Sequence, residues 1–280
     1  MARIIDEDYI LNNGVRIPKL AFGTWQIPDG EAAEAVRKAI LAGYRYIDTA
    51  VDYGNERGVG EGLRRSGADR DRILITTKIL AEQKTYEGAA ASINESLERL
   101  GTDYADLMLI HAPKPWAEIE AGSTRKYFKE NLAVWKAMEE AYEAGKVRAI
   151  GVSNFSIEDI ANILDGGRIR PSVNQVKVHV GHTPFELLDW CRTQGILVLA
   201  YCPNGHGELL KAGTPAGELL AETASRYGVS VPQICIRYDL QLGTLPIPKT
   251  TDEAHMRQNA EVDFVISDAD MERLKAVART

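Results

Sequence analysis

The chain has 280 residues, a length that suits either two ordinary domains or one α/β barrel. Its net charge of -7 and isoelectric point near 5.4 argue against nucleic acid or an anionic membrane as a partner. Three scattered cysteines are too few for a disulfide framework, and no segment reaches the roughly 18 apolar residues of a membrane span. We therefore expect a cytoplasmic protein with free thiols and no signal peptide.

The first predicted element is a β-hairpin at about residues 8–18, because Asn13-Gly14 between alternating apolar residues is typical of a tight turn. Amphipathic patterns such as residues 31–43, 89–101 and 131–146 predict helices. These helices alternate with eight apolar runs that predict strands, at residues 20–23, 44–48, 73–78, 105–111, 147–154, 172–175, 196–201 and 244–249.

Alternation of apolar strands with helices is typical of a parallel sheet covered by helices, either a closed barrel or an open doubly wound sheet. The count of eight strands favours a (β/α)8 TIM barrel. No Pro/Gly/Ser-rich linker divides the chain, so we predict a single domain over residues 1–280. The longest gap, residues 112–128, predicts a loop at the mouth of a substrate pocket, and it carries Trp116.

Polar residues terminate nearly every predicted strand. Barrel active sites are built at the carboxyl ends of strands, so these residues are expected to face one crevice. In chain order they are Asp48, Lys78, His111, Ser153, Asn154, Gln175, Tyr201 and Lys249.

Three chemistries compete for this set. A metal site is disfavoured because His111 has no His or Cys at ligand spacing. A Schiff-base aldolase would use Lys78, but a nearby Asp48 would hold that amine in its charged form. In the third, Lys78 lowers the pKa of Tyr53 and makes the phenol a proton donor near neutrality, while His111 binds the oxygen of a carbonyl that accepts a hydride.

With these residues the chain resembles the aldo-keto reductase family over essentially its whole length, and it is similar to the bacterial 2,5-diketo-gluconate reductase branch. The resemblance rests on six motifs in register: GYRYIDTAVDYGNE, LITTK, LMLIH, AIGVSNF, VNQV and AYCPNG. It implies reversible reduction of aldehydes or ketones by NAD(P)H, which is bound without a Rossmann domain. The catalytic residues that it implies are Asp48, Tyr53, Lys78 and His111.

The same resemblance implies that Ser153, Asn154 and Gln175 hold the nicotinamide carboxamide, that Tyr201 stacks on its ring, and that Trp25 and Trp116 wall the substrate pocket. Further cofactor-binding residues implied by it are Cys202, Asn204, Lys249, Thr250, His255, Gln258 and Asn259. The glycines of GVGEG at residues 58–62 lie in a helical pattern and have the wrong spacing for a dinucleotide fingerprint.

Two positions depart from the family pattern around the adenosine 2'-phosphate. His255 stands where an Arg is expected, and Gln258 where a Glu is expected. A guanidinium is always charged and binds phosphate bidentately, whereas histidine is mostly neutral near pH 7. We therefore expect NADH to be used as well as NADPH, with NADPH still favoured through Lys249, and Arg257 is a possible substitute for the missing Arg.

Other departures affect the pocket: Ala112 and Asn204 replace residues common in the family, the stretch VNQVKVHVGHTP replaces a usual Glu-Leu-His-Pro, and the chain ends soon after the last predicted helix. We expect an open pocket, a small-molecule carbonyl substrate and a monomer. A cofactor-sensing subunit built on the same barrel, like the potassium-channel β subunits, is the alternative from another functional class. Asp52 is expected to be a solvated turn residue, while Asn55 caps the next helix and Glu56 complements its dipole.

Overall fold

The computed structural model describes residues 3–211 and 213–277. After a 3-10 turn, η1 (Ile4–Asp6), strands β1 (Asp8–Ile10) and β2 (Arg16–Pro18) form the antiparallel hairpin. Gly14 has φ +85° and donates its N–H to the Leu11 carbonyl at 2.9 Å, the conformation for which glycine was expected in this turn. The predicted hairpin is confirmed.

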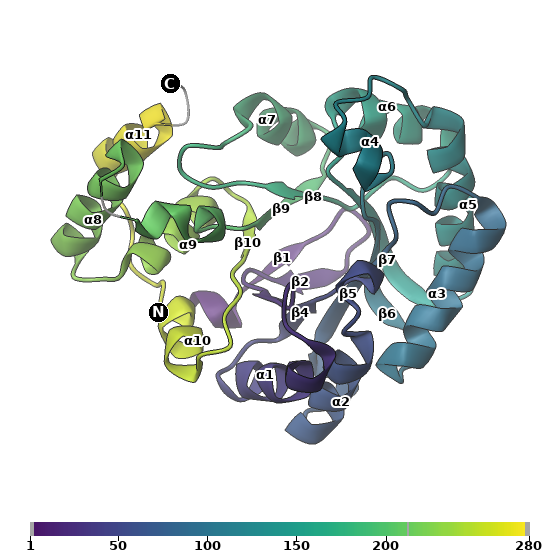
Figure 1. Ribbon diagram of the computed structural model, residues 1–280, viewed down its shortest axis with the longest axis horizontal. Helices are drawn as coiled ribbons and strands as arrows, with labels where there is room; N and C mark the ends of the chain where they lie inside the picture. The colour runs from purple at the N-terminus through teal and green to yellow at the C-terminus, as the bar shows by residue number, and fades with distance from the viewer. Residues whose placement is uncertain (1–2, 212, 278–280) are drawn as a thin grey trace.

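Eight parallel strands follow in chain order and lie side by side in that order (Figure 1). The Ala21 N–H donates to the Pro246 carbonyl at 3.1 Å and the Gly23 N–H to the Pro248 carbonyl at 2.9 Å, so the first and last strands also meet. The (β/α)8 barrel is therefore confirmed. Its strands are β3 (Phe22–Gly23), β4 (Tyr46–Asp48), β5 (Leu74–Ile79), β6 (Ala105–Ile110), β7 (Val147–Ser153), β8 (Val173–Lys177), β9 (Leu197–Tyr201) and β10 (Leu245–Ile247).

Helices surround the strands (Figure 1). They are α1 (Asp29–Leu41), α2 (Glu56–Ser66), α3 (Tyr86–Leu100), α4 (Trp116–Glu120), α5 (Phe128–Glu143), α6 (Ile157–Gly166), α7 (Phe185–Thr193), α8 (Pro215–Tyr227), α9 (Val231–Gln241), α10 (Glu253–Ala260) and α11 (Asp268–Val277). Short 3-10 turns occur at η2 (Val51–Tyr53), η3 (Arg70–Arg72) and η4 (Gly205–Leu210). Among the residues described, no helix combines the length and the apolar character needed to cross a membrane.

The interior of the barrel is an apolar core that the hairpin closes from below. Leu11 and Ile17 of the hairpin region pack with inward-facing strand residues such as Leu107, Val173 and Leu199. This packing fills the amino-terminal end of the barrel, and in the view of Figure 1 the hairpin is seen across the opening of the ring of strands. Only the carboxyl ends of the strands are left to form a site.

The glycine run at residues 58–62 lies within α2, so it does not form a strand-to-helix phosphate loop. A Cβ placed on Gly60 would collide with the Leu100 backbone at the end of α3, and one on Gly62 would collide with the Ala33 carbonyl of α1. These glycines allow α2 to pack closely against both neighbouring helices.

Candidate active site

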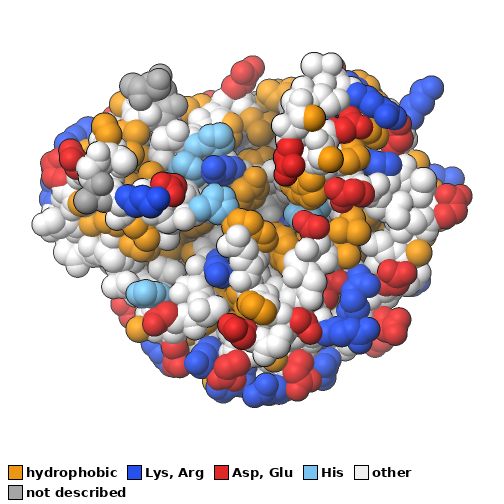
Figure 2. Space-filling view, in the orientation of Figure 1, with side chains coloured by type: hydrophobic (Ala, Val, Ile, Leu, Met, Phe, Trp, Pro, Cys, Tyr) orange, Lys and Arg blue, Asp and Glu red, His pale blue; other side chains and the backbone are white. Residues whose placement is uncertain are grey.

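A cavity of about 740 Å³ opens at the carboxyl ends of the strands. Figure 2 shows this face of the molecule hollowed near its centre. The predicted site residues that line the cavity are Trp25, Asp48, Tyr53, His111, Trp116, Ser153, Asn154, Gln175, Tyr201, Cys202, Asn204 and Lys249. The strand-end residues predicted from the sequence therefore face one crevice, except that Lys78 lies beneath the lining.

Several lining residues were not predicted: Gly23, Gln26, Asp52, Glu120, Pro203, His206, Gly207, Leu210, Ile247 and Pro248. Pro203, His206 and Gly207 lie in the loop after Tyr201, in which Cys202 and Asn204 had already been predicted, so the position of this loop was the signal that could have found them. Asp52 was expected to be a solvated turn residue. It is exposed, but it lies on the rim of the cavity.

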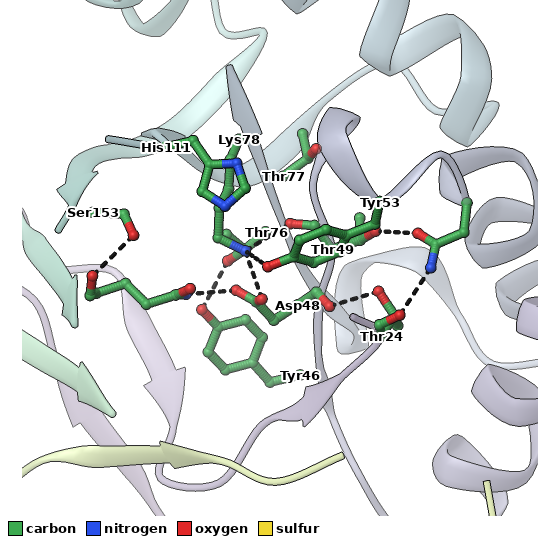
Figure 3. A network of polar contacts seen from close by, with 12 residues as sticks. Thr24, Tyr46, Asp48, Thr49, Tyr53, Thr76, Thr77, Lys78, His111 and Ser153 are labelled. Atoms are coloured by element: carbon green, nitrogen blue, oxygen red, sulfur yellow. Dashed lines mark hydrogen bonds and ion pairs between the residues drawn. The ribbon is translucent and has the colours of Figure 1, made fainter. Parts of the chain in front are cut away.

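A buried ion pair forms the floor of the site (Figure 3). The Lys78 ammonium lies 2.6 Å from the Asp48 carboxylate and donates to the Thr49 carbonyl at 2.9 Å. The other Asp48 oxygen accepts a 2.7 Å hydrogen bond from the Gln175 side-chain amide. Both carboxylate oxygens and the ammonium are thus held by partners from three separate strands and one loop.

Tyr53 projects over this pair from the 3-10 turn η2, which ends at Gly54 with φ +65°. The Lys78 ammonium lies 3.3 Å from the Tyr53 hydroxyl. The expectation that Lys78 would lower the pKa of Tyr53 is wrong. Burial, with the negative charge of Asp48 added to it, raises the pKa of Tyr53 well above its ordinary value. At neutral pH the phenol therefore keeps its proton.

Burial also shifts the pKa of Lys78. Its side chain is fully buried, and burial lowers the pKa of Lys78 while the charge and hydrogen bond of Asp48 oppose that shift. The Lys78 ammonium is closer to the Asp48 carboxylate, at 2.6 Å, than to the Tyr53 hydroxyl, at 3.3 Å. The negative charge of Asp48 therefore offsets the effect of this cation on the pKa of Tyr53.

His111 stands beside Tyr53 at the end of β6. Its ring packs edge-on against Tyr53, with centroids 5.7 Å apart, and against Trp116, with centroids 5.2 Å apart. Burial, followed by the charge of Lys78, lowers the pKa of His111 to about 3. The imidazole is therefore neutral at physiological pH and has one N–H to donate.

A second polar network joins the ends of β7, β8 and β9. The Ser153 hydroxyl donates to the Gln175 carbonyl at 2.9 Å, and the Asn154 amide donates to the His111 carbonyl at 3.0 Å. The Tyr201 hydroxyl donates to the Asn154 side-chain oxygen at 2.9 Å. This network fixes the orientation of the cavity wall opposite Tyr53.

The predicted adenosine residues lie at a different place. Lys249 lines the cavity, whereas Thr250, His255, Gln258 and Asn259 lie outside it, in α10 and the segment before it. Asp252 caps α10 by accepting the His255 N–H at 2.9 Å, and Arg257 pairs with Glu253 at 2.7 Å. Arg257, the possible substitute for the missing Arg, is already engaged by a carboxylate.

Asn55 does not act as the capping side chain that the sequence predicted. It precedes α2, but its buried amide donates to the Thr24 and Ile27 carbonyls, and its oxygen accepts from Thr49. Glu56 begins the helix as expected, but its carboxylate is buried and bound by Thr77 and Arg99. Tertiary contacts replace the local capping bonds and tie the loop carrying Tyr53 to the segment between β3 and α1.

Within residues 3–211 and 213–277, no group of three or more His, Cys, Asp or Glu side chains is arranged to hold a metal ion. Two buried ring nitrogens at the cavity have no hydrogen-bond partner in the described structure, the His111 Nδ1 and the Trp116 Nε1.

Comparison with known proteins agrees with this geometry. Residues 19–279 match the model of the Aldo/keto reductase family. The chain is 41% identical over 266 residues to the 9,11-endoperoxide prostaglandin H2 reductase of Trypanosoma cruzi, covering 94% of this chain and 89% of that protein. It is 40% identical over 269 residues to the glyoxal reductase of Bacillus subtilis, covering 95% and 91%.

The chain is also similar to a solved structure that contains a bound cofactor. The Bombyx mori aldo-keto reductase in complex with NADP superposes with a TM-score of 0.85 at 33% identity, covering 96% of this chain and 92% of that one. Both the sequence match and the structural match span nearly the whole chain. The chain therefore belongs to the aldo/keto reductase family and is an NAD(P)H-dependent oxidoreductase that reduces carbonyl groups.

Proposed function

We propose that Tyr53 donates the proton in this reduction, and that Lys78 and Asp48 support it. The observation that carries this assignment is the chain of contacts from Asp48 to Lys78 at 2.6 Å and from Lys78 to the Tyr53 hydroxyl at 3.3 Å, beside the cavity. When bound, the reduced nicotinamide supplies a hydride to the carbonyl carbon. The negative charge that develops on the carbonyl oxygen is the charge that Tyr53 neutralises.

The raised pKa of Tyr53 fits this role. An alkoxide is a stronger base than a phenolate, so a phenol that holds its proton at neutral pH can still transfer it once the alkoxide forms. Lys78 then lies close enough to stabilise the phenolate. Neutral His111 donates a hydrogen bond to the same substrate oxygen and orients it.

The cavity wall suits the nicotinamide. Ser153, Asn154 and Gln175 offer amide and hydroxyl groups on one side, and Tyr201 places an aromatic ring beside them. The buried side-chain oxygen of Asn204, in the next loop, has no partner among the described residues and is a further acceptor. We assign these residues, with Cys202, to the cofactor, and Trp25 and Trp116 to the walls of the substrate pocket.

For the adenosine end we assign Lys249, Thr250, His255, Gln258 and Asn259, and we propose that NADH serves as well as NADPH. Two observations support dual use. Asp252 lies 3.9 Å from the His255 ring, and Glu253 holds Arg257 in an ion pair, so carboxylates accompany both candidate cations. A 2'-phosphate bound here would meet those negative charges as well as Lys249.

The competing roles have less support. Lys78 lies below the cavity lining and is bound by Asp48, Thr49 and Tyr53, which disfavours its use as a Schiff-base nucleophile. Asp48, Tyr53, Lys78 and His111 are all in place, which disfavours a purely sensing subunit. We also propose a cytoplasmic location and a monomer; the free cysteines at positions 191, 202 and 235 suit the reducing compartment.

The test is the oxidation of reduced nicotinamide across a panel of aldehydes and ketones, with Tyr53→Phe as the matched variant. We expect turnover by the natural chain and a loss of at least about a hundredfold in kcat for Tyr53→Phe, since general acids typically contribute that much. Full activity of Tyr53→Phe would refute its role as proton donor.

Cofactor use is tested by kcat/KM for NADPH and NADH. We expect a ratio below a thousand in the natural chain, and a shift of roughly tenfold or more toward NADPH in His255→Arg, because a charged hydrogen bond to phosphate is worth about that much. A natural preference above a thousandfold for NADPH would refute dual use.

A further inference from the structure

The segment that follows His111 leaves the sheet at the end of β6. The His111 N–H still donates to the Ile79 carbonyl at 3.1 Å, at the end of the ladder between β5 and β6. The carbonyls of His111, Ala112 and Pro113 have no backbone partner among the residues described, and all three residues are buried. Buried carbonyls need hydrogen bonds, so side chains have to supply them here.

Three side chains bind these carbonyls. The first carbonyl accepts from the Asn154 amide at 3.0 Å. The Lys84 ammonium donates to the Ala112 carbonyl at 2.9 Å, and the Asn131 amide donates to the Pro113 carbonyl, also at 2.9 Å. Lys84 donates in addition to the Asn131 side-chain oxygen at 2.9 Å. Lys84, from the loop before α3, and Asn131, from α5, therefore form one unit, which we call the clamp.

Lys84 brings a charge into a partly buried place. Its ammonium lies 5.9 Å from the centre of the Tyr127 ring. Burial lowers the pKa of Lys84 to about 8, against the charges of Glu82, Glu130 and Asp159, which raise it. In most molecules the amine is therefore charged at neutral pH, and its two hydrogen bonds are of the stronger, charge-assisted kind.

The loop that carries Lys84 holds the segment at a second point. The Glu82 carboxylate accepts the Trp116 N–H at 3.1 Å, where α4 begins. Trp116 packs edge-on against His111, and both line the cavity. Lys84 and Asn131 are not among the residues that line it. An effect of the clamp on the reaction therefore passes through the segment from His111 to Trp116.

We propose that Lys84 and Asn131 are positioning residues, which hold the ring of His111 at the distance from Tyr53 that the reduction requires. The inference rests on the proposed function and adds two residues that touch neither substrate nor cofactor. His111 and Tyr53 have to meet the same substrate oxygen, so the backbone that carries His111 cannot shift without separating the two donors. A misplacement of about 1 Å can cost up to about a hundredfold in rate.

The experiment measures kcat and KM for benzaldehyde, whose carbonyl is its only polar group, with NADPH. We expect Lys84→Met to lower kcat by about tenfold to a hundredfold while KM for NADPH is retained, because the donors are misplaced and the cofactor contacts are not. Lys84→Arg keeps a charged donor and is expected to retain most of kcat. Thermal unfolding shows whether each variant is folded.

A His111→Gln background separates positioning from a general loss of structure. If Lys84 acts through His111, Lys84→Met costs little further activity once the imidazole is gone. A general loosening of the fold would lower kcat by the same factor in both backgrounds. Equal factors would therefore overturn the proposal, and so would an unchanged kcat in Lys84→Met.

Asn131→Ala and Asn12→Ala form a matched pair. Asn12, in the hairpin turn, donates from its side chain to the Pro171 carbonyl at 2.9 Å, as Asn131 does to Pro113. Both variants lose an asparagine bond to a proline carbonyl, but Pro171 precedes β8, at the opposite end of the barrel from the cavity. We expect only Asn131→Ala to lower kcat, and equal losses in the two variants would contradict the clamp.

Nuclear magnetic resonance supplies a readout that does not depend on activity. The His111 ring packs against the rings of Tyr53 and Trp116, so its proton signals, which His111→Gln lacks, report its position. We expect these signals to move in Lys84→Met and to stay in place in Asn12→Ala. Full activity of His111→Gln would refute the proposed role of His111, whereas the ring signals would still decide the clamp: moved signals in Lys84→Met support it, and unmoved signals overturn it.

Discussion

Lys78 and Asp48 are both buried, and each is the main counter-charge of the other. Removing one partner of a buried ion pair leaves an uncompensated charge in a medium of low polarity, at a cost of about 3–5 kcal/mol. We expect Lys78→Met to lower the free energy of unfolding by about that amount, as measured by urea denaturation. The double variant Asp48→Asn/Lys78→Met should recover much of the loss, and an additive loss would contradict the pairing.

His111 makes stability depend on pH with a definite sign. Its pKa is about 3 in the fold and 6.5 in the reference state, so only the unfolded chain binds a proton between these values. The stabilisation is complete above pH 6.5 and falls as the pH drops toward 3. Between pH 6.5 and pH 5 the loss from this group is about 2 kcal/mol.

We therefore expect His111→Gln to lose less stability than the natural chain over this interval, as measured by unfolding at both pH values. Equal losses in the two proteins would show that His111 is not buried in its neutral form. The same neutrality predicts that the pH dependence of kcat/KM has no step near pH 6.5 from this residue.

Among the elements, the close packing of α2 reverses the usual preference for alanine over glycine within a helix. Alanine normally stabilises a helix by about 1 kcal/mol relative to glycine. At Gly60, however, the added methyl group would meet the Leu100 backbone, which cannot move aside without shifting α3.

We expect Gly60→Ala to destabilise the protein by about 1–3 kcal/mol, measured by denaturant unfolding. Gly30→Ala is the control, because Gly30 lies in α1 with open space around its Cα. That substitution should be neutral or slightly stabilising. If both variants behave alike, close contact between α2 and α3 is not the reason for glycine at residue 60.

For the whole molecule, closure of the barrel makes the first and last strands neighbours. Neither half of the strand ring has a complete core, because the interior cluster draws on residues from the hairpin to β10. We propose a single cooperative unit and a monomer of 30.9 kDa. Urea unfolding followed by fluorescence and by circular dichroism should give coincident transitions, and light scattering should give the monomer mass. Two separate transitions would indicate two domains.

Much of this architecture could be predicted from the sequence, because apolar runs and helical periodicity are local patterns that predict strands and helices. The apolar runs of β5, β6 and β7 and the helical periodicity of α1, α3 and α5 appear where they were expected. The strand-end rule also brought Asp48, His111 and Gln175 to one cavity. It failed for residues that reach the cavity from loops, such as His206 and Asp52, because no local pattern states where a loop lies.

The sequence by itself predicted the eight strands of a barrel and the set of polar groups at their carboxyl ends, since periodicity and strand-end position depend on near neighbours in the chain. Its motifs carried the resemblance to the family. Only the tertiary structure decided the protonation of those groups. Burial, with the charge of Asp48 added to it, raises the pKa of Tyr53, and Asn55 binds distant carbonyls instead of capping α2. Desolvation and long-range hydrogen bonds depend on what surrounds a residue in space, which composition and spacing do not specify.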